Sequence, residues 1–167
     1  MPFPYYKKLN RYDKAIYRQS DQIDRIELPR PKELADLVPA IAEALAGERR
    51  SDLTVACQEL ADQLLSQLSV PPVTVKVLKV RPSEDWGELH GLFEPAEDGT
   101  SARVTLWMKT AHRRNTVAFK TFLRTLLHEL GHHLDYEFLE LEDSFHTEGF
   151  FKRESSLFRQ ITAAKTT

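Results

Sequence analysis

A long helical repeat of apolar residues runs from position 119 to position 134. Apolar side chains recur there at intervals of three and four residues, which is the spacing of one face of an α-helix. They are Phe119, Phe122, Leu123, Leu126, Leu127, Leu130 and Leu134. The pattern predicts a long amphipathic helix with one face packed on a core.

Two shorter helical patterns precede this helix, and one follows it. Residues 32–46 form the first pattern, and Gly47 favours its end. Residues 51–68 form the second, which Ser51 can cap and which ends before Pro71. We expect these two helices to form a hairpin. The helix after the long one has the apolar stripe Phe150, Phe151, Leu157, Phe158 and Ile161.

Between the helices, apolar and polar residues alternate with the two-residue period of strands. Residues 73–80 show this alternation, and residues 87–93 and 103–108 flank Asp98 and Gly99, a dipeptide that favours a hairpin turn. We expect three strands in one small sheet. The predicted fold class is therefore α+β, with an N-terminal helical hairpin, a three-stranded sheet, the long helix and a C-terminal helix.

At 167 residues the chain fits one domain with an appended arm. We expect the arm to be residues 1–32, which are polar, broken by prolines and extended apart from a short helix near 13–18. Its tyrosines and lysines could stack on and neutralise single-stranded nucleic acid, but packing of the rings on the parent domain is the favoured interpretation. The domain itself is expected to span residues 33–162, with residues 163–167 as a frayed end.

The charge balance and the cysteine content narrow the function classes. A net charge of −2 provides no strong field for nucleic acid or an anionic membrane. The single cysteine, Cys57, cannot form an internal disulfide, and its place in a predicted helix suits a small buried apolar residue. Because we find neither a signal-peptide pattern nor an apolar run of bilayer length, we expect a soluble, cytoplasmic protein.

The long helix carries His128, Glu129 and His132 in the pattern His-Glu-x-x-His. Four residues are just over one helical turn, so the two imidazoles project from the same face and can converge on one cation. Zinc suits neutral imidazole nitrogens and keeps a position open for water when the protein supplies three ligands. Glu129 flanks that face, where it can act as a general base. Ordinary helix histidines are the alternative, but the amphipathic context favours a metal.

The chain also shows a likeness to a known group of enzymes over residues 73–161. The combination of strands, a His-Glu-x-x-His helix and a following helix opened by His146-x-x-x-Phe150 resembles the zincin metallopeptidases. Within that group it is similar to the minimal SprT-like and WLM-like families. The resemblance implies a minimal zincin-like fold and zinc-dependent hydrolysis of a peptide or protein substrate.

In these families two helix histidines and a third histidine bind zinc, and the glutamate is catalytic. The resemblance therefore implies Zn²⁺ at His128, His132 and His146, with Glu129 as the general base and acid. The chain has neither a cysteine pair for an accessory zinc ribbon nor a basic tail, so a nucleic-acid partner is not expected.

Glu154 competes with His146 for the position of third ligand. It has the spacing of zincins that use a glutamate from a downstream helix, and it falls on an apolar stripe where a carboxylate needs a partner. A metal would satisfy it, as would the free ring N–H of a zinc-bound histidine. We favour His146 as the ligand. Asp135 either holds a ligand imidazole or is solvated, and His133 is expected to point away from the metal face.

A rival function comes from a different class of protein. The chain could hold zinc for structure, or use a degenerate protease cleft to recognise a peptide without cleaving it. For either use of the cleft, the hairpin of residues 87–108 is the expected edge for pairing with an extended peptide. His90 is expected to lie on a strand, where it could contact a substrate, but a solvent-facing histidine is the favoured interpretation.

Overall fold

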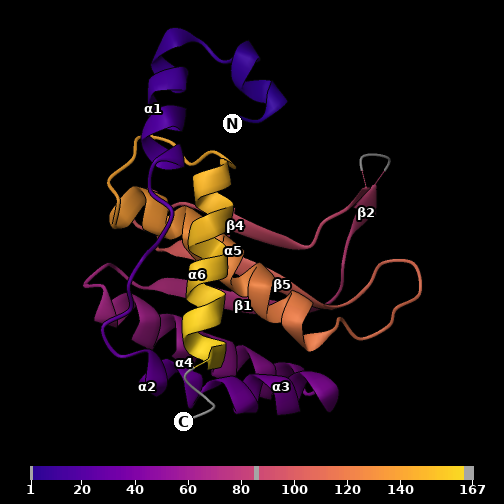
Figure 1. The fold of residues 1–167 in the computed structure, drawn as a ribbon. Helices are drawn as coiled ribbons and strands as arrows, with labels where there is room; N and C mark the ends of the chain where they lie inside the picture. Colours follow the sequence, from indigo (N-terminus) through magenta and orange to yellow (C-terminus); the bar gives the residue numbers. More distant parts are fainter. Residues whose placement is uncertain (1, 85–86, 164–167) are drawn as a thin grey trace.

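A small mixed sheet organises the fold (Figure 1). The computed structural model describes residues 2–84 and 87–163. Strands β1 (Val73–Val80) and β5 (Ala102–Lys109) pair in parallel, and β4 (Gly91–Glu94) pairs with β5 in the antiparallel direction. The order β1-β5-β4 makes β5 the central strand and β4 an edge strand. The expected α+β class and three-stranded sheet are confirmed.

The hairpin prediction is right at the turn between β4 and β5 and wrong at its start. Gly99 has a φ of 81°, in the left-handed region that favours glycine. Residues 87–93, expected as one strand, are divided, because β3 (Gly87–Glu88) pairs with β2 (Ser83–Glu84) in a separate two-stranded sheet. Strands of two residues are too short for alternation to reveal them.

The single helix expected over residues 32–46 is two helices, α2 (Pro31–Ala35) and α3 (Val38–Ala46). Pro39 explains the break. It has no N–H to donate, and in a continuous helix its ring would clash with the carbonyl of Ala35, four residues earlier. The chain therefore turns before Pro39, which occupies the first turn of α3, where a missing N–H is tolerated.

Helix α4 (Arg50–Gln67) forms the expected hairpin with α3 and packs on β1. It begins one residue before Ser51, so the cap expected at Ser51 is wrong. The side-chain amide of Gln58 donates to Val73 O and accepts from Val75 N, each at 2.8 Å, which ties the helix to the strand. The predicted stripe of α4 is buried throughout at Leu53, Cys57, Leu60, Ala61, Leu64 and Leu68.

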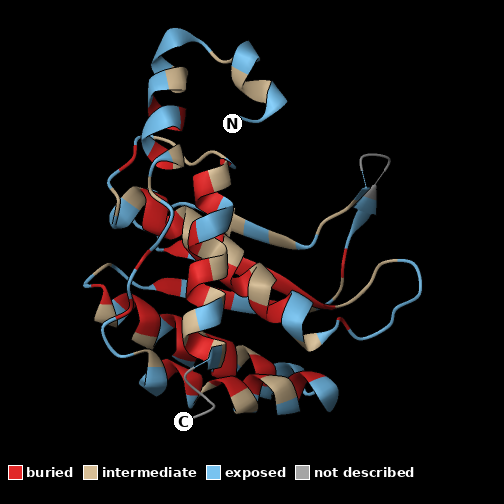
Figure 2. Ribbon diagram, viewed as in Figure 1, coloured by how far each residue is buried: buried red, intermediate tan, exposed pale blue. Residues whose placement is uncertain are grey.

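Helix α5 (Phe119–Glu137) is the predicted long helix, and it packs on β4 and β5. Helix α6 (Glu148–Ala163) crosses α5 on the side away from the sheet (Figure 1). Figure 2 shows buried residues on α4, α5 and α6 and on the strands, and most of the buried apolar residues of these elements belong to one continuous core. None of the described helices combines the length and the apolar character that crossing a membrane requires.

The N-terminal segment is helical, which corrects the expectation of an extended arm. It contains the 3₁₀ helix η1 (Pro4–Lys8) and helix α1 (Arg11–Asp21), which is longer than the short helix expected at 13–18. Asn10 caps α1, because its side chain accepts a hydrogen bond from Asp13 N at 2.7 Å. This cap is the signal in the sequence that the expectation overlooked.

The Tyr17 ring of this segment packs on the domain, as expected, whereas the Tyr12 ring is 62% exposed. Tyr17 is fully buried, and its ring lies beside those of Tyr5, Tyr6 and Phe145. Helix α1 also contacts α6. At the other end of the chain, α6 continues through Ala163, and the remainder of the predicted frayed end lies outside the described residues.

Candidate metal centre

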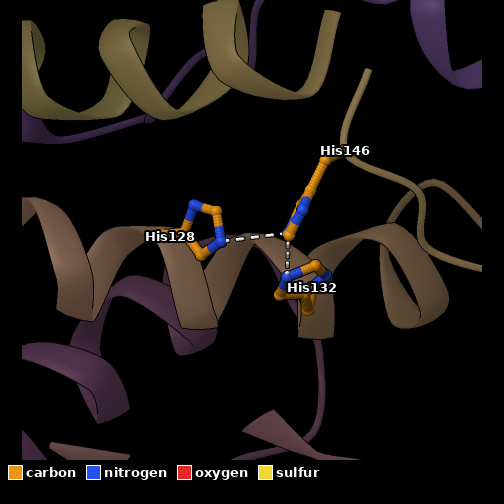
Figure 3. Close-up of side chains that lie close together, drawn as sticks. All are labelled: His128, His132 and His146. Carbon is orange, nitrogen blue, oxygen red and sulfur yellow. Dashed lines mark hydrogen bonds between the residues drawn. The ribbon is translucent and has the colours of Figure 1, made fainter. Parts of the chain in front are cut away.

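Three histidine side chains converge on one point between α5 and the loop that precedes α6 (Figure 3). Nε2 of His146 lies 3.1 Å from Nε2 of His128 and 3.0 Å from Nε2 of His132. His128 and His132 are one turn apart on α5, whereas His146 lies just before the first turn of α6. The fold thus brings together the three histidines that the motif and the resemblance singled out.

The outer nitrogens of two of these rings show where their protons lie. Nδ1 of His128 is 2.7 Å from a carboxylate oxygen of Glu154, which can only accept. Nδ1 of His132 is 2.7 Å from Ser144 Oγ, and that hydroxyl already donates its proton to Asp135 Oδ2 at 2.7 Å. Both rings therefore donate from Nδ1. When the rings are neutral, both Nε2 atoms carry lone pairs.

These lone pairs fit a metal ion. A single N–H on His146 Nε2 can point at only one of the two neighbouring lone pairs, so the imidazoles cannot satisfy one another. A cation at the centre would be bound by all three nitrogens. Tetrahedral coordination with Zn–N bonds of about 2.0–2.1 Å places ligand nitrogens roughly 3.3 Å apart. The two separations from His146 are close to this value, and all three ligand nitrogens lie within 4.8 Å of one another. Burial also lowers the pKa of His132 to about 3, with help from the neighbouring His128 and His146, which keeps that ring in its neutral, ligating form.

Glu154 supports a histidine from the outer side of its ring. Its carboxylate binds His128 Nδ1 and lies 3.6 Å from an Arg124 guanidinium nitrogen. It is therefore on the far side of the His128 ring from the converging Nε2 atoms. Of the two candidates for third ligand, His146 has its Nε2 among the converging nitrogens, and Glu154 lies behind the His128 ring.

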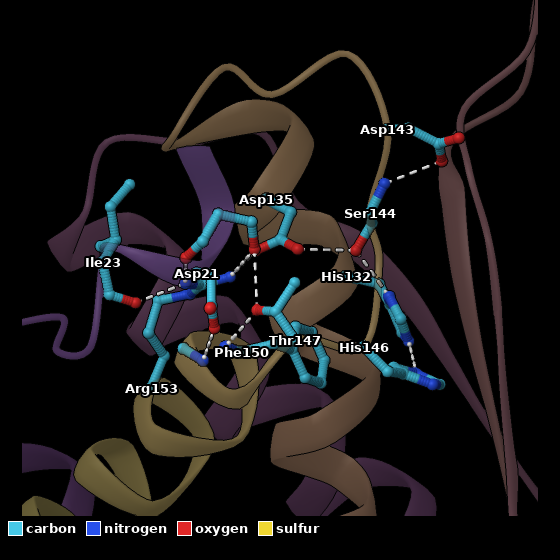
Figure 4. Close-up of polar contacts among 12 residues, drawn as sticks. Asp21, Ile23, His132, Asp135, Asp143, Ser144, His146, Thr147, Phe150 and Arg153 are labelled. Atoms are coloured by element: carbon cyan, nitrogen blue, oxygen red, sulfur yellow. Dashed lines mark hydrogen bonds and ion pairs between the residues drawn. The ribbon is translucent and has the colours of Figure 1, made fainter. Parts of the chain in front are cut away.

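A longer chain of contacts supports His132 (Figure 4). Ser144 Oγ connects its Nδ1 to Asp135, and the other carboxylate oxygen of Asp135 is 3.0 Å from Arg153 Nη2. Asp135 is 1% exposed, so the alternative of a solvated carboxylate is wrong. Burial raises its pKa, and the Arg153 guanidinium opposes that rise. Ser144 and Arg153 were missed in the sequence, because neither belongs to a local pattern that marks a ligand support.

Glu129 lies beside the three histidines with its side chain largely buried. Burial raises the pKa of its carboxyl to about 7, while His128 opposes the rise and Glu154 adds to it. Gly91, the first residue of β4, passes close to this side chain. A Cβ at Gly91 would lie 3.0 Å from Glu129 Oε2 and 2.6 Å from the Thr125 methyl group. The absence of a side chain at Gly91 lets the edge strand approach the carboxylate.

A cleft of about 490 Å³ opens over the histidines and Glu129. One wall comes from the segment that joins β3 to β4, and the opposite wall comes from the exposed face of α5. The lining residues that matter here are Gly91, Arg124, Thr125, Glu129 and His146. The centre is therefore accessible to a ligand larger than water.

The remaining two histidines with sequence predictions lie apart from the centre. His133 is buried, and its Nε2 is 2.7 Å from Pro71 O, so it faces away from the other rings as expected. His90 is exposed as expected, but it lies between β3 and β4 and not on a strand, and it lines the cleft.

Comparison of the chain with protein-family models, with curated proteins and with solved structures yields no match. The class of the centre therefore rests on its own geometry. That geometry consists of three converging imidazole nitrogens, a buried carboxylate beside them and an open cleft above.

Proposed function

We propose that the protein is a zinc-dependent peptidase of the zincin-like class, with His128, His132 and His146 as zinc ligands and Glu129 as the catalytic base. One observation carries the proposal. Two lone pairs from α5 and the Nε2 of His146 face the same point, and none of the described side chains supplies a cation there. The adjacent carboxylate and cleft favour catalysis over a purely structural zinc site.

Zinc held by the three imidazoles would lower the pKa of a bound water to about 7 and polarise a substrate carbonyl. Glu129 accepts the proton of the attacking water and later delivers it to the leaving amine. Its buried position beside Gly91 holds the carboxylate over the cleft and limits its exchange with solvent. Glu154 and Ser144 orient the two α5 imidazoles through their Nδ1 atoms.

The substrate we propose is an extended segment of peptide or protein. Strand β4 has β5 on one side, and within the described residues no strand pairs with its other side. An extended chain can add to such an edge through main-chain hydrogen bonds. The sequence expectation placed this edge in the hairpin of residues 87–108. The structure narrows it to β4, because β5 is the central strand.

The substitution Glu129→Gln tests the proposal, because the amide preserves the shape of the side chain but cannot accept the proton. The variant should retain zinc and thermal stability and lose cleavage of a mixed peptide library analysed by mass spectrometry. Cleavage at the wild-type rate by this variant would overturn the role of Glu129. Zinc at full occupancy with no cleavage by the wild-type protein would favour the non-catalytic alternative.

A further inference from the structure

We infer that the N-terminal segment, residues 2–21, is part of the metal centre, and that Tyr5 is a positioning residue for His146. Zinc binding and docking of this segment should therefore stabilise each other. The inference rests on the proposed zinc site and extends it to a part of the chain that the zincin resemblance does not cover.

The N-terminal segment contacts the main chain at His146. His146 lies in the loop before α6, so no helical hydrogen bonds hold its backbone in place. The hydroxyl of Tyr5 donates to His146 O at 2.7 Å. One residue on, Thr147 Oγ1 is 3.1 Å from Ser20 Oγ, and both residues are fully buried. One residue of the N-terminal segment thus binds the main chain that carries the third imidazole, and another binds the side chain of the next residue.

The N-terminal segment also supports His132, through a series of hydrogen bonds that begins at Arg153 (Figure 4). Arg153 binds Asp135, and Asp135 orients Ser144 and through it the His132 ring. The guanidinium of Arg153 is itself held by Ser20, to whose carbonyl and hydroxyl it donates at 2.6 and 2.9 Å. The end of α1 therefore positions the charge that supports a second imidazole.

The end of α1 is closely packed against the start of α6. Asp21 Oδ1 accepts a hydrogen bond from Gly149 N at 2.9 Å, in the first turn of that helix. A Cβ at Gly149 would lie only 2.6 Å from Ser20 O and 2.7 Å from Asp21 O, so the two backbones meet without an intervening side chain. Displacement of α1 would leave the buried Arg153, Thr147 and Gly149 groups without these partners.

This arrangement couples zinc binding to docking of the N-terminal segment. A docked segment holds His146 and His132 in the geometry that zinc needs, so docking raises zinc affinity. By thermodynamic reciprocity, bound zinc must favour the docked segment to the same extent.

Two single substitutions on η1 test the inference. Tyr5→Phe removes the hydroxyl that contacts His146 and leaves the ring in place. Tyr6→Phe is the matched control, because the Tyr6 hydroxyl accepts a hydrogen bond from Arg18 at 2.7 Å and its ring also packs on Tyr17. The zinc Kd is measured by competition with a chromophoric chelator. Thermal unfolding of each metal-free protein measures the effect of each substitution on stability.

We expect Tyr5→Phe to weaken zinc binding by about 3- to 10-fold, the equivalent of one hydrogen bond, while Tyr6→Phe leaves the Kd unchanged. The Tm of the two metal-free variants should agree. Hydrogen exchange of the α1 amides should slow when zinc is added to the wild-type protein. The slowing should be smaller in Tyr5→Phe.

Equal zinc Kd values for the two variants and the wild type would overturn the inference and leave the proposed function intact. Exchange in α1 that is unaffected by zinc would also overturn it. Absence of zinc binding by the wild-type protein would instead refute the proposed zinc site, and with it the inference that rests on that site.

Discussion

The two histidines of the α5 motif are supported by similar groups in opposite environments. His128 donates directly to Glu154, which pairs with Arg124, and the side chains of Glu154 and Arg124 are 13% and 42% exposed. His132 reaches its carboxylate through the Ser144 hydroxyl, and the Asp135–Arg153 pair behind it is 1% and 3% exposed. Each support is a carboxylate paired with an arginine. One pair lies at the cleft and the other lies in the core.

The two supports differ in how much of their charge is buried, and the free-energy cost of burying charge explains the difference in their partners. Arg124 is at the cleft and keeps contact with water, so the Glu154–Arg124 pair stays partly hydrated although the Glu154 side chain itself is only 13% exposed. A carboxylate in the core needs a partner for each oxygen, and Asp135 has Arg153 on one and Ser144 on the other. The Ser144 hydroxyl, which Asp135 orients, accepts the hydrogen bond from His132 Nδ1. The Asp135 charge is therefore one group further from the imidazole. We therefore expect Glu154 and Arg124 to act mainly on zinc affinity. We expect Asp135 and Arg153 to act on the free energy of unfolding as well as on zinc affinity.

The largest expected effect is on the ligands themselves. His128→Ala and His132→Ala should each abolish tight zinc binding, because each removes one of three nitrogens, and His146→Ala should do the same. His112→Ala is the control, since His112 is exposed in the loop before α5. Metal analysis of the purified proteins measures the result. Full zinc occupancy in both α5 variants would refute the site, and zinc retained by His146→Ala but lost by Glu154→Gln would make Glu154 the third ligand.

The next largest expected effect is on stability, and it distinguishes Arg153 from Arg124. Arg153→Met should lower the free energy of unfolding by about 3–5 kcal/mol, because it leaves the buried Asp135 carboxylate without its cation. Arg124→Met removes the cation of a partly hydrated pair whose N–O distance is 3.6 Å, and it should cost about 1 kcal/mol or less. Urea denaturation of the metal-free proteins gives both values. Similar losses for the two variants would show that the two supports do not differ as proposed.

The smallest effect compares the groups that touch the rings. Glu154→Gln should weaken zinc binding by about 10- to 100-fold, as expected for the partner of a ligand imidazole. Ser144→Ala should weaken it by about 10-fold or less, because a neutral hydroxyl forms a weaker hydrogen bond than a carboxylate. Chelator competition measures both Kd values. A larger loss for Ser144→Ala would reverse the ranking of the two supports.

The sequence predicted the parts of this fold that repeat locally. The period of α5 and the alternation in β1 both correspond to observed elements, and the His-Glu-x-x-His pattern located two of the three converging rings. The break at Pro39 and the cap at Asn10 were local signals that could have been used. Both act over only one turn, so they do not alter the period from which the helices were predicted.

The supports of the centre could not be predicted in this way. Ser144 lies in a loop, and its role depends on where the ends of α5 and α6 meet. Tyr5 contacts a backbone carbonyl, and any residue at position 146 would present that group. Arg153 has the sequence position of a polar residue on an amphipathic helix, yet it is 3% exposed, because Asp135 and the carbonyl groups of Ser20 and Ile23 accept hydrogen bonds from its guanidinium. Such contacts depend on tertiary structure, which leaves no periodic trace in a single sequence.

The contacts between the two ends of the chain also determine when the centre can form. Tyr5 and His146 are 141 residues apart in sequence, and Ser20 and Thr147 are 127 apart. During synthesis the N-terminal segment leaves the ribosome well before α6, so its partners are made much later than the segment itself. Closing so long a loop has a large entropic cost that only late native contacts offset. Metal capture should therefore be among the final events of folding, after the sheet and α5 have formed a surface on which the two ends can meet.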